Sequence, residues 1–183
     1  MEEKSKMVVV RRRLNADGKD RTAAIEYRPI GWIETPFVRA DGTPIQSCYA
    51  DGAEGVVVVA EEYAAGLKDI EAFDRLWLVY AIDRACAPQL TVTPYLSDEA
   101  HGIFATRSPA RPNAIGISPV RLLAVEGNRI RVAGVDMLDG TPLLDIKPYV
   151  PAFDVLPAER IGWFEGRLRE GVTADGRFER DGD

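Results

Sequence analysis

Two arginines, two hydroxyls and an amide lie close together in the run GIFATRSPARPNAIGIS, residues 102–118. The side chains are those of Thr106, Arg107, Ser108, Arg111 and Asn113. Arginine presents a planar fork of donors that matches a carboxylate or a phosphate, so this pattern suits an anionic ligand. The alternative is a stiff connection whose arginines pair with some of the 29 acidic side chains of the chain.

Two prolines control the backbone of this run. A proline fixes its own φ, lacks an N–H donor and disfavours helix at the residue before it. Ser108-Pro109 and Arg111-Pro112 are therefore expected to be rigid extended or turn dipeptides. The sequence predicts that the polar side chains between them project from a stiff, non-helical segment.

A second group of polar residues follows at 138–147. The run Leu138-Asp139-Gly140-Thr141-Pro142 has the composition of a tight turn. Asp145 and Lys147 are two residues apart, and side chains with this spacing share one face of a strand. This acid and base are candidate catalytic residues, and a surface ion pair is the alternative.

Composition predicts one soluble, cytoplasmic domain. The chain has 183 residues, of which 46% are hydrophobic and 28% charged, and no apolar run approaches the roughly 20 residues that span a bilayer. Its net charge of −6 argues against coating nucleic acid by bulk electrostatics, although local basic patches stay open.

The cysteine pattern predicts no metal site. Cys48 and Cys86 form no CxxC motif, and His101 is the only histidine of the sequence. Each cysteine is expected to be a small buried apolar residue, and a nucleophilic Cys/His pair is the alternative.

The chain divides into three parts. Residues 1–25 are expected to form a flexible arm or a loosely attached strand, residues 26–155 the organised domain, and residues 156–183 a charged, exposed tail.

Within the organised domain, short apolar segments rich in Val and Ile are separated by Gly, Pro and Asp, which is typical of β structure. Glu126-Gly127-Asn128 predicts a hairpin turn, and the one convincing helical stretch is 61–67. We therefore expect a mainly β fold, a small closed β-barrel with short helices in its connections. The sequence has no GxGxxG motif that follows a strand and opens a helix, so we do not expect a Rossmann-type cofactor site. The expected strands are 30–34, 55–59, 76–82, 90–93, 102–105, 120–125, 129–135 and 143–147.

Four runs in consistent order resemble a known family. They are FDRLWLVY at 73–80, the 102–118 run, DGTP at 139–142 and DIKPY at 145–149. Together they closely resemble the TsaA-like family, which includes the TrmO-type tRNA methyltransferases. The resemblance covers roughly residues 30–153.

The resemblance implies a β-barrel that binds S-adenosylmethionine without a Rossmann fold and works as a homodimer. It also implies methylation of the exocyclic amine of the threonylcarbamoyl-adenosine beside the tRNA anticodon. The cofactor-binding residues that it implies, with the polar residues of the central run, are Pro44, Ile45, Gln46, Asp83, Arg84, Thr106, Arg107, Ser108, Arg111, Asn113, Ile117, Asp139, Gly140, Thr141 and Pro142.

The chain departs from the family pattern at Asp83, where a histidine is common, and it ends about thirty residues past Phe153, without the further C-terminal domain of the longer members. A local strip drawn from Arg75, Arg84, Arg111 and Arg121 is expected to hold the anticodon loop across a dimer. Two other functions stay open: a small-molecule methyltransferase and a non-catalytic module that binds a nucleotide-like ligand.

Overall fold

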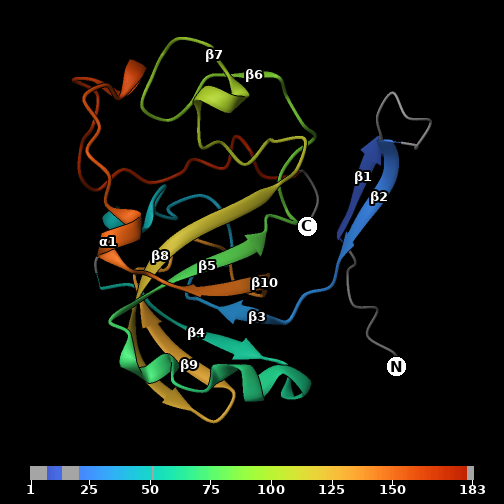
Figure 1. Ribbon diagram of the computed structural model, residues 1–183. Coiled ribbons are helices and arrows are strands. Elements are labelled where there is room, and N and C mark those ends of the chain that lie inside the picture. Colours follow the sequence, from blue (N-terminus) through green and yellow to red (C-terminus); the bar gives the residue numbers. More distant parts are fainter. Residues whose placement is uncertain (1–7, 14–20, 51, 181–183) are drawn as a thin grey trace.

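The computed structural model of the protein describes residues 8–13, 21–50 and 52–180, and the side chains from residue 25 onward (Figure 1). In this part of the chain the strands are β1 (Val8–Arg13), β2 (Arg21–Tyr27), β3 (Gly31–Glu34), β4 (Glu54–Val59), β5 (Arg75–Ala81), β6 (Thr91–Val92), β7 (His101–Gly102), β8 (Ile115–Glu126), β9 (Arg129–Ala133) and β10 (Thr141–Pro148). The short helices are the 3-10 helices η1 (Ser47–Tyr49), η2 (Glu61–Leu67), η3 (Ile70–Ala72), η4 (Ile103–Ala105) and η5 (Gly162–Phe164), and α1 (Pro151–Asp154).

Six strands form a closed antiparallel barrel in the order β10-β3-β4-β9-β8-β5. The mainly β closed barrel expected from the sequence is confirmed. The turn at Glu126-Gly127-Asn128 joins β8 to β9 as expected, and Gly127 has the positive φ of 64° that favours glycine there.

The barrel core follows from the alternation of side chains along each strand. In β5, Leu76 and Leu78 are fully buried and Tyr80 is 8% exposed, whereas the residues between them are less buried. Val57, Ile130 and Leu143 from three other strands belong to the same cluster. Burying a side chain of this size contributes about 1.5–3 kcal/mol, so the barrel is the main source of stability.

Two expected strands are wrong or shortened. Residues 102–105 do not form a strand: after the two-residue β7, the chain turns into η4. The backbone N–H and the Oγ1 of Thr106 both donate to the Ile103 carbonyl, at 3.1 and 2.9 Å, and this local bonding closes the turn. The strand expected at 90–93 is reduced to β6.

Strand β8 is longer than expected and has two halves. Residues 121–126 pair with β9, whereas residues 115–121 pair with β5. Pro119 has no N–H to donate and lies in the half whose described partner strand is β5 alone. This half of β8 therefore extends beyond the shared wall of the barrel.

The expectation of an exposed C-terminal tail is wrong for residues 172–180. Phe178 is 6% exposed and packs with Val92, Ile103 and Ala110 in a second apolar cluster. Backbone bridges join Pro44 to Thr173 and Ala85 to Glu179. The segment is held in place because its backbone pairs with two loops. Its charged composition gives no indication of this pairing. Residues 181–183 lie outside the described residues.

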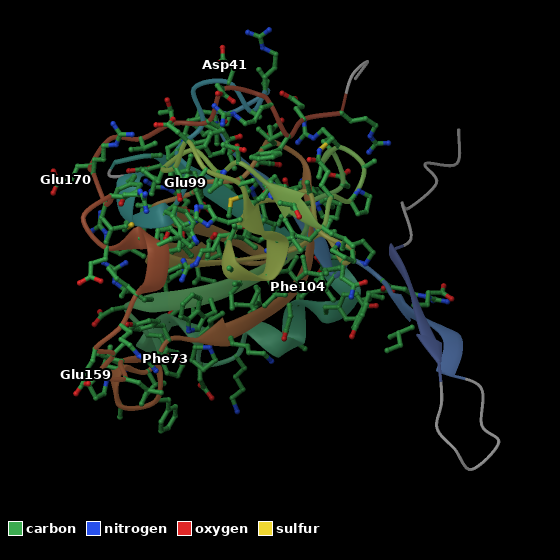
Figure 2. All side chains as sticks on the ribbon, turned by 90° about the horizontal axis from the view of Figure 1, so that it is seen from above. Asp41, Phe73, Glu99, Phe104, Glu159 and Glu170 are labelled. Atoms are coloured by element: carbon green, nitrogen blue, oxygen red, sulfur yellow. The ribbon has the colours of Figure 1, made fainter. Side chains whose placement is uncertain are left out.

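The expected N-terminal arm is a strand pair where it is described. β1 and β2 form an antiparallel hairpin beside the barrel (Figure 1), and residues 1–7 and 14–20 of the arm lie outside the described residues. The loop between β5 and β8 and the C-terminal segment lie at one end of the barrel, which Figure 2 views from above. No helix in the described chain is long and apolar enough to cross a membrane.

Replacing Phe178 with alanine should lower the free energy of unfolding by about 3–5 kcal/mol, because the change leaves a cavity in the second cluster. Urea unfolding followed by tryptophan fluorescence measures this loss. Phe104→Ala is the matched control, since Phe104 is 78% exposed, and it should cost less than about 1 kcal/mol. Equal losses for the two variants would show that the segment does not pack as described.

Candidate functional site

A large cavity lies where the extended half of β8 meets the loops and the C-terminal segment. Its volume is about 910 Å³, at the upper end of the 300–1,000 Å³ typical of small-molecule sites. The regions of the chain that line it include the loop at 43–49, the strand ends of β5 and β8, the loop at 106–111, residues from 136–141 and the C-terminal residues Ala174, Phe178 and Glu179. Residues far apart in the sequence thus meet around one space.

Most of the cofactor residues predicted from the sequence line this cavity. They are Pro44, Ile45, Gln46, Asp83, Arg84, Thr106, Arg107, Ser108, Arg111, Ile117 and Thr141. Four others, Asn113, Asp139, Gly140 and Pro142, do not belong to the lining.

Arg107 and Ser108 are the donors of the central run that are best placed for a ligand. The Arg107 guanidinium donates to the Gln46 side-chain oxygen, which ties the run to the loop at 43–49. Ser108 is 7% exposed, and its buried Oγ has no hydrogen-bond partner. A buried hydroxyl without a partner is costly, so this atom is available for a bound molecule.

Arg111 and Thr106 have mainly structural contacts. Arg111 Nη1 donates to the carbonyls of Ile103 and Thr106, at 3.2 and 2.9 Å, and the guanidinium lies 5.9 Å from the Phe104 ring centre. The Thr106 hydroxyl donates to Ile103 and accepts from the Ser108 N–H. These two side chains hold the shape of the run from which Arg107 projects.

The turn at 138–142 contributes Leu138 and Thr141 to the cavity lining and supports the site through its other residues. Asp139 Oδ1 accepts from the Thr35 N–H at 2.9 Å, and the Asp139 carbonyl accepts from Arg84. Gly140 has a φ of 73°, which a side chain would disfavour. The Asp139 carboxylate is therefore engaged in joining this turn to the end of β3, while its carbonyl positions Arg84.

The Asp145–Lys147 pair does not reach the cavity. Lys147 Nζ lies 2.7 Å from Asp145 Oδ2, and the two side chains are 64% and 46% exposed on β10. Neither residue lines the cavity. The structure gives this pair the geometry of the surface ion pair that the sequence left open.

Three functional candidates that the sequence analysis missed form a hydrogen-bonded chain at the cavity wall. Tyr80, Ser118 and Asp136 all line the cavity. Ser118 Oγ donates to Asp136 Oδ1 at 2.6 Å, and Tyr80 Oη lies 3.0 Å from Ser118 Oγ. The one signal in the sequence is the acid between two apolar residues, Val135 and Met137, which are both buried in the core.

Burial changes the proton affinity of both ends of this chain. Desolvation raises the pKa of Asp136 to about 6, against the lowering effect of the Ser118 hydrogen bond, nearby backbone N–H groups and the charge of Arg107. Desolvation, followed by the charge of Asp136, raises the pKa of the Tyr80 hydroxyl. At neutral pH the phenol is therefore protonated and the carboxylate is mostly ionised.

Gly116 explains how Tyr80 fits into the wall. A Cβ at residue 116 would lie 2.1 Å from the Tyr80 ring, so only glycine leaves room for it. The two residues are cross-strand partners of β8 and β5. The ring thus packs against the backbone of the extended half of β8.

Cys86 and His101 do not belong to the cavity lining, whereas Cys48 does. Both cysteines are free. The expectation of a buried residue is wrong for Cys48, which is exposed in the short helix η1, whereas Cys86 is half-buried beside the second cluster. His101 contacts Ser97 and stacks on Trp163, with ring centres 4.5 Å apart. Among the described residues, no group of three or more His, Cys, Asp or Glu side chains is placed to hold a metal ion.

Residues 32–155 match the family described as the tRNA-methyltransferase O N-terminal domain. The chain belongs to this family. It is 54% identical over 154 residues to a Pyrococcus abyssi protein named "Probable S-adenosyl-L-methionine-binding protein", and the match covers 83% of this chain and 84% of that one.

Two further relatives extend the comparison. A human protein named tRNA (adenine(37)-N6)-methyltransferase is 34% identical over 141 residues, which is 73% of this chain and 32% of the human one. The crystal structure of TrmO from Pseudomonas aeruginosa aligns with a TM-score of 0.63 at 35% identity. That alignment covers 75% of this chain and 61% of the solved one, so the chain spans about three fifths of that structure.

Asp136→Asn should stabilise the protein at pH 7.5 by up to about 3 kcal/mol. The pKa of Asp136 is about 6 in the folded protein against an ordinary value of 3.8, so the folded state binds the proton more tightly. The wild type therefore loses stability as the pH rises from about 4 to about 6. The neutral amide avoids this loss.

Urea unfolding of both proteins at pH 4 and pH 7.5 measures the difference. The advantage of the variant should be largest at pH 7.5 and mostly absent at pH 4. A difference that does not change between the two values would contradict the raised proton affinity.

Proposed function

We propose that this protein is an S-adenosylmethionine-dependent methyltransferase that modifies tRNA. Its proposed acceptor is the exocyclic amine of the threonylcarbamoyl-adenosine beside the anticodon. The observation that carries the proposal is the cavity beside the 102–118 run, with Arg107 and Ser108 in its lining and the buried Ser108 hydroxyl without a partner, in a member of this family.

The cavity residues fit the cofactor group by group. Its carboxylate suits the Arg107 guanidinium, and its ribose hydroxyls suit Ser108 and Gln46. Its adenine suits apolar wall residues such as Ile45 and Phe178. When bound, the cofactor supplies a methyl group that is already activated by a sulfonium.

The residues of the chain then contribute alignment and exclusion of water. Transfer of a methyl group is an in-line displacement, so much of the rate comes from holding the acceptor nitrogen against the methyl carbon. Phe178 and Glu179 of the C-terminal segment form part of the cavity wall, and a bound cofactor against this wall would displace water from it. The Asp145–Lys147 pair has no step in this proposal, because it lies on the outer surface.

Two arginines support an RNA acceptor despite the net charge of −6. Arg75 on β5 and Arg121 on β8 are exposed cross-strand partners. Like charges in this position destabilise a sheet unless an anion lies between them. Arg75 shares the outer face of β5 with Trp77, which lines the cavity, so a phosphate held by the arginines would lie on the same face.

Incubating the protein with methyl-labelled cofactor and tRNA tests this function. Two tRNA preparations are needed, one carrying threonylcarbamoyl-adenosine and one lacking it, and nucleosides are analysed by mass spectrometry. Label is expected only in the first preparation. Label in neither would overturn the proposal, and cofactor binding without any transfer would instead indicate a ligand-binding module.

Arg107→Ala should weaken cofactor binding by about tenfold to a hundredfold, because it removes a charge-assisted contact worth about 1.5–3 kcal/mol. Isothermal titration calorimetry measures the change. Arg131→Ala is the matched control, since Arg131 pairs with Glu54 on the outer surface and does not line the cavity. Unchanged binding in Arg107→Ala would remove this residue from the site.

We also propose that the protein is a homodimer that covers an apolar surface beside the cavity. Phe153, Val155 and Leu156 are 74%, 64% and 76% exposed. They flank Asp154, which lines the cavity together with the exposed Ile117. Exposed apolar side chains in such number beside a site are typical of an interface.

Leu156→Asp should convert the dimer into a monomer, because it places a charge in the apolar surface. Size-exclusion chromatography with light scattering gives the mass in solution. Leu90→Asp is the control, since Leu90 is 72% exposed and does not line the cavity. A wild-type protein that is monomeric at all concentrations would exclude the dimer.

A further inference from the structure

The hydrogen-bonded side chains of Tyr80, Ser118 and Asp136 have no role in the cofactor contacts proposed above. An ionised carboxylate only accepts hydrogen bonds, so the 2.6 Å contact requires Ser118 to donate to Asp136. The Ser118 oxygen is then left to accept from the Tyr80 O–H, 3.0 Å away. The three groups therefore have one consistent direction of hydrogen bonding toward the carboxylate.

The three hydrogen-bonded side chains are held rigidly by the surrounding structure. Ser118 is 2% exposed. The Tyr80 ring packs against the backbone of Gly116, in the space that a Cβ would occupy. Asp136 follows β9 and lies between Val135 and Met137, which are anchored in the barrel core. Asp136 is a half-buried residue and is thus held in one place at the wall of the cavity.

Methylation of a nitrogen that carries hydrogen releases a proton. We propose that the Asp136 carboxylate accepts this proton from the acceptor nitrogen, an inference that rests on the proposed function. The new N–C bond forms as the C–S bond breaks, and the electron pair of that bond stays on sulfur. The N–H proton passes to Asp136 and from there to water.

The surroundings of Asp136 suit this role. The titratable and charged groups that act on it are Tyr80, which stays protonated, and Arg107, whose charge favours the ionised acid. With a pKa of about 6, Asp136 is mostly ionised at pH 7.5 yet binds a proton far more strongly than an ordinary aspartate. A base works best when its pKa lies near the operating pH.

Asp136→Asn tests the proposal by single-turnover methyl transfer to threonylcarbamoylated tRNA at saturating cofactor. We expect a rate loss of about 10²–10⁴-fold, with unchanged cofactor affinity in calorimetry. Asp69→Asn is the matched control: Asp69 is exposed, does not line the cavity and has a φ of 67°, which asparagine tolerates. A full rate in Asp136→Asn, or a loss explained by weaker cofactor binding, would overturn the proposal.

Ser118→Ala tests whether Asp136 accepts a proton or has only a structural role. The Ser118 hydrogen bond lowers the pKa of Asp136, so its removal should raise this pKa. The rate rises with pH as the base ionises, and this rise should therefore move to higher pH in the variant. A uniform loss with an unmoved pH profile would indicate a structural role alone and overturn the proposal.

Carbon-13 NMR of the aspartate carboxyl groups gives a readout that does not depend on tRNA. The Asp136 signal, assigned by its absence in Asp136→Asn, should titrate near pH 6 in the cofactor-free protein and at higher pH in Ser118→Ala. If the signal titrates in this way but the wild type methylates no tRNA, the proposed function fails and takes the acceptor assignment with it. If the wild type methylates tRNA and Asp136→Asn does so equally well, only the inference on Asp136 fails.

Discussion

The register between β5 and β8 is the constraint on which the site depends. It places Tyr80 opposite Gly116 and Leu78 opposite Ser118. Tyr80 lies over the glycine and its hydroxyl reaches Ser118. A shift by one residue would turn these side chains to the opposite face of the sheet and bring Leu76 and Leu78 out of the core.

The same strand pair decides where the cavity lies. Residues 115–120 of β8 extend beyond β9, so other parts of the chain can pack against this half of the strand. Residues 106–111 line the cavity beside this half of β8, and Ile103 and Ala110 anchor them in the second apolar cluster with Phe178. Arg107 and Ser108 lie between these two anchors, so the backbone that carries their side chains is held in place.

The site contains groups that are unfavourable for folding. Asp136 is held where burial opposes its charge, and Ser108 has a buried hydroxyl without a partner. Proteins commonly lose stability at functional sites in this way, and the barrel core provides the compensating burial. Arg111, by contrast, uses its donors on carbonyls of its own run and so supports the loop.

The sequence by itself determined the barrel, because the alternation of apolar residues and the glycine and proline turns are local signals. Most of the cofactor residues that it indicated, through the 102–118 run and the resemblance to a family, line the cavity. Local patterns were insufficient for the C-terminal segment, whose Phe178 is surrounded by charged residues and becomes buried only by pairing with distant loops.

Tertiary structure alone decided which polar residues face the cavity. Asp145 and Lys147 looked like an acid and a base, yet their strand turns them to the outer surface. Asp136 looked like one acid among many, yet it accepts a hydrogen bond from Ser118, which lies 18 residues earlier, on β8. The proton affinity of a carboxylate depends on burial and on neighbours that come from other strands, so this property exists only once the barrel has closed.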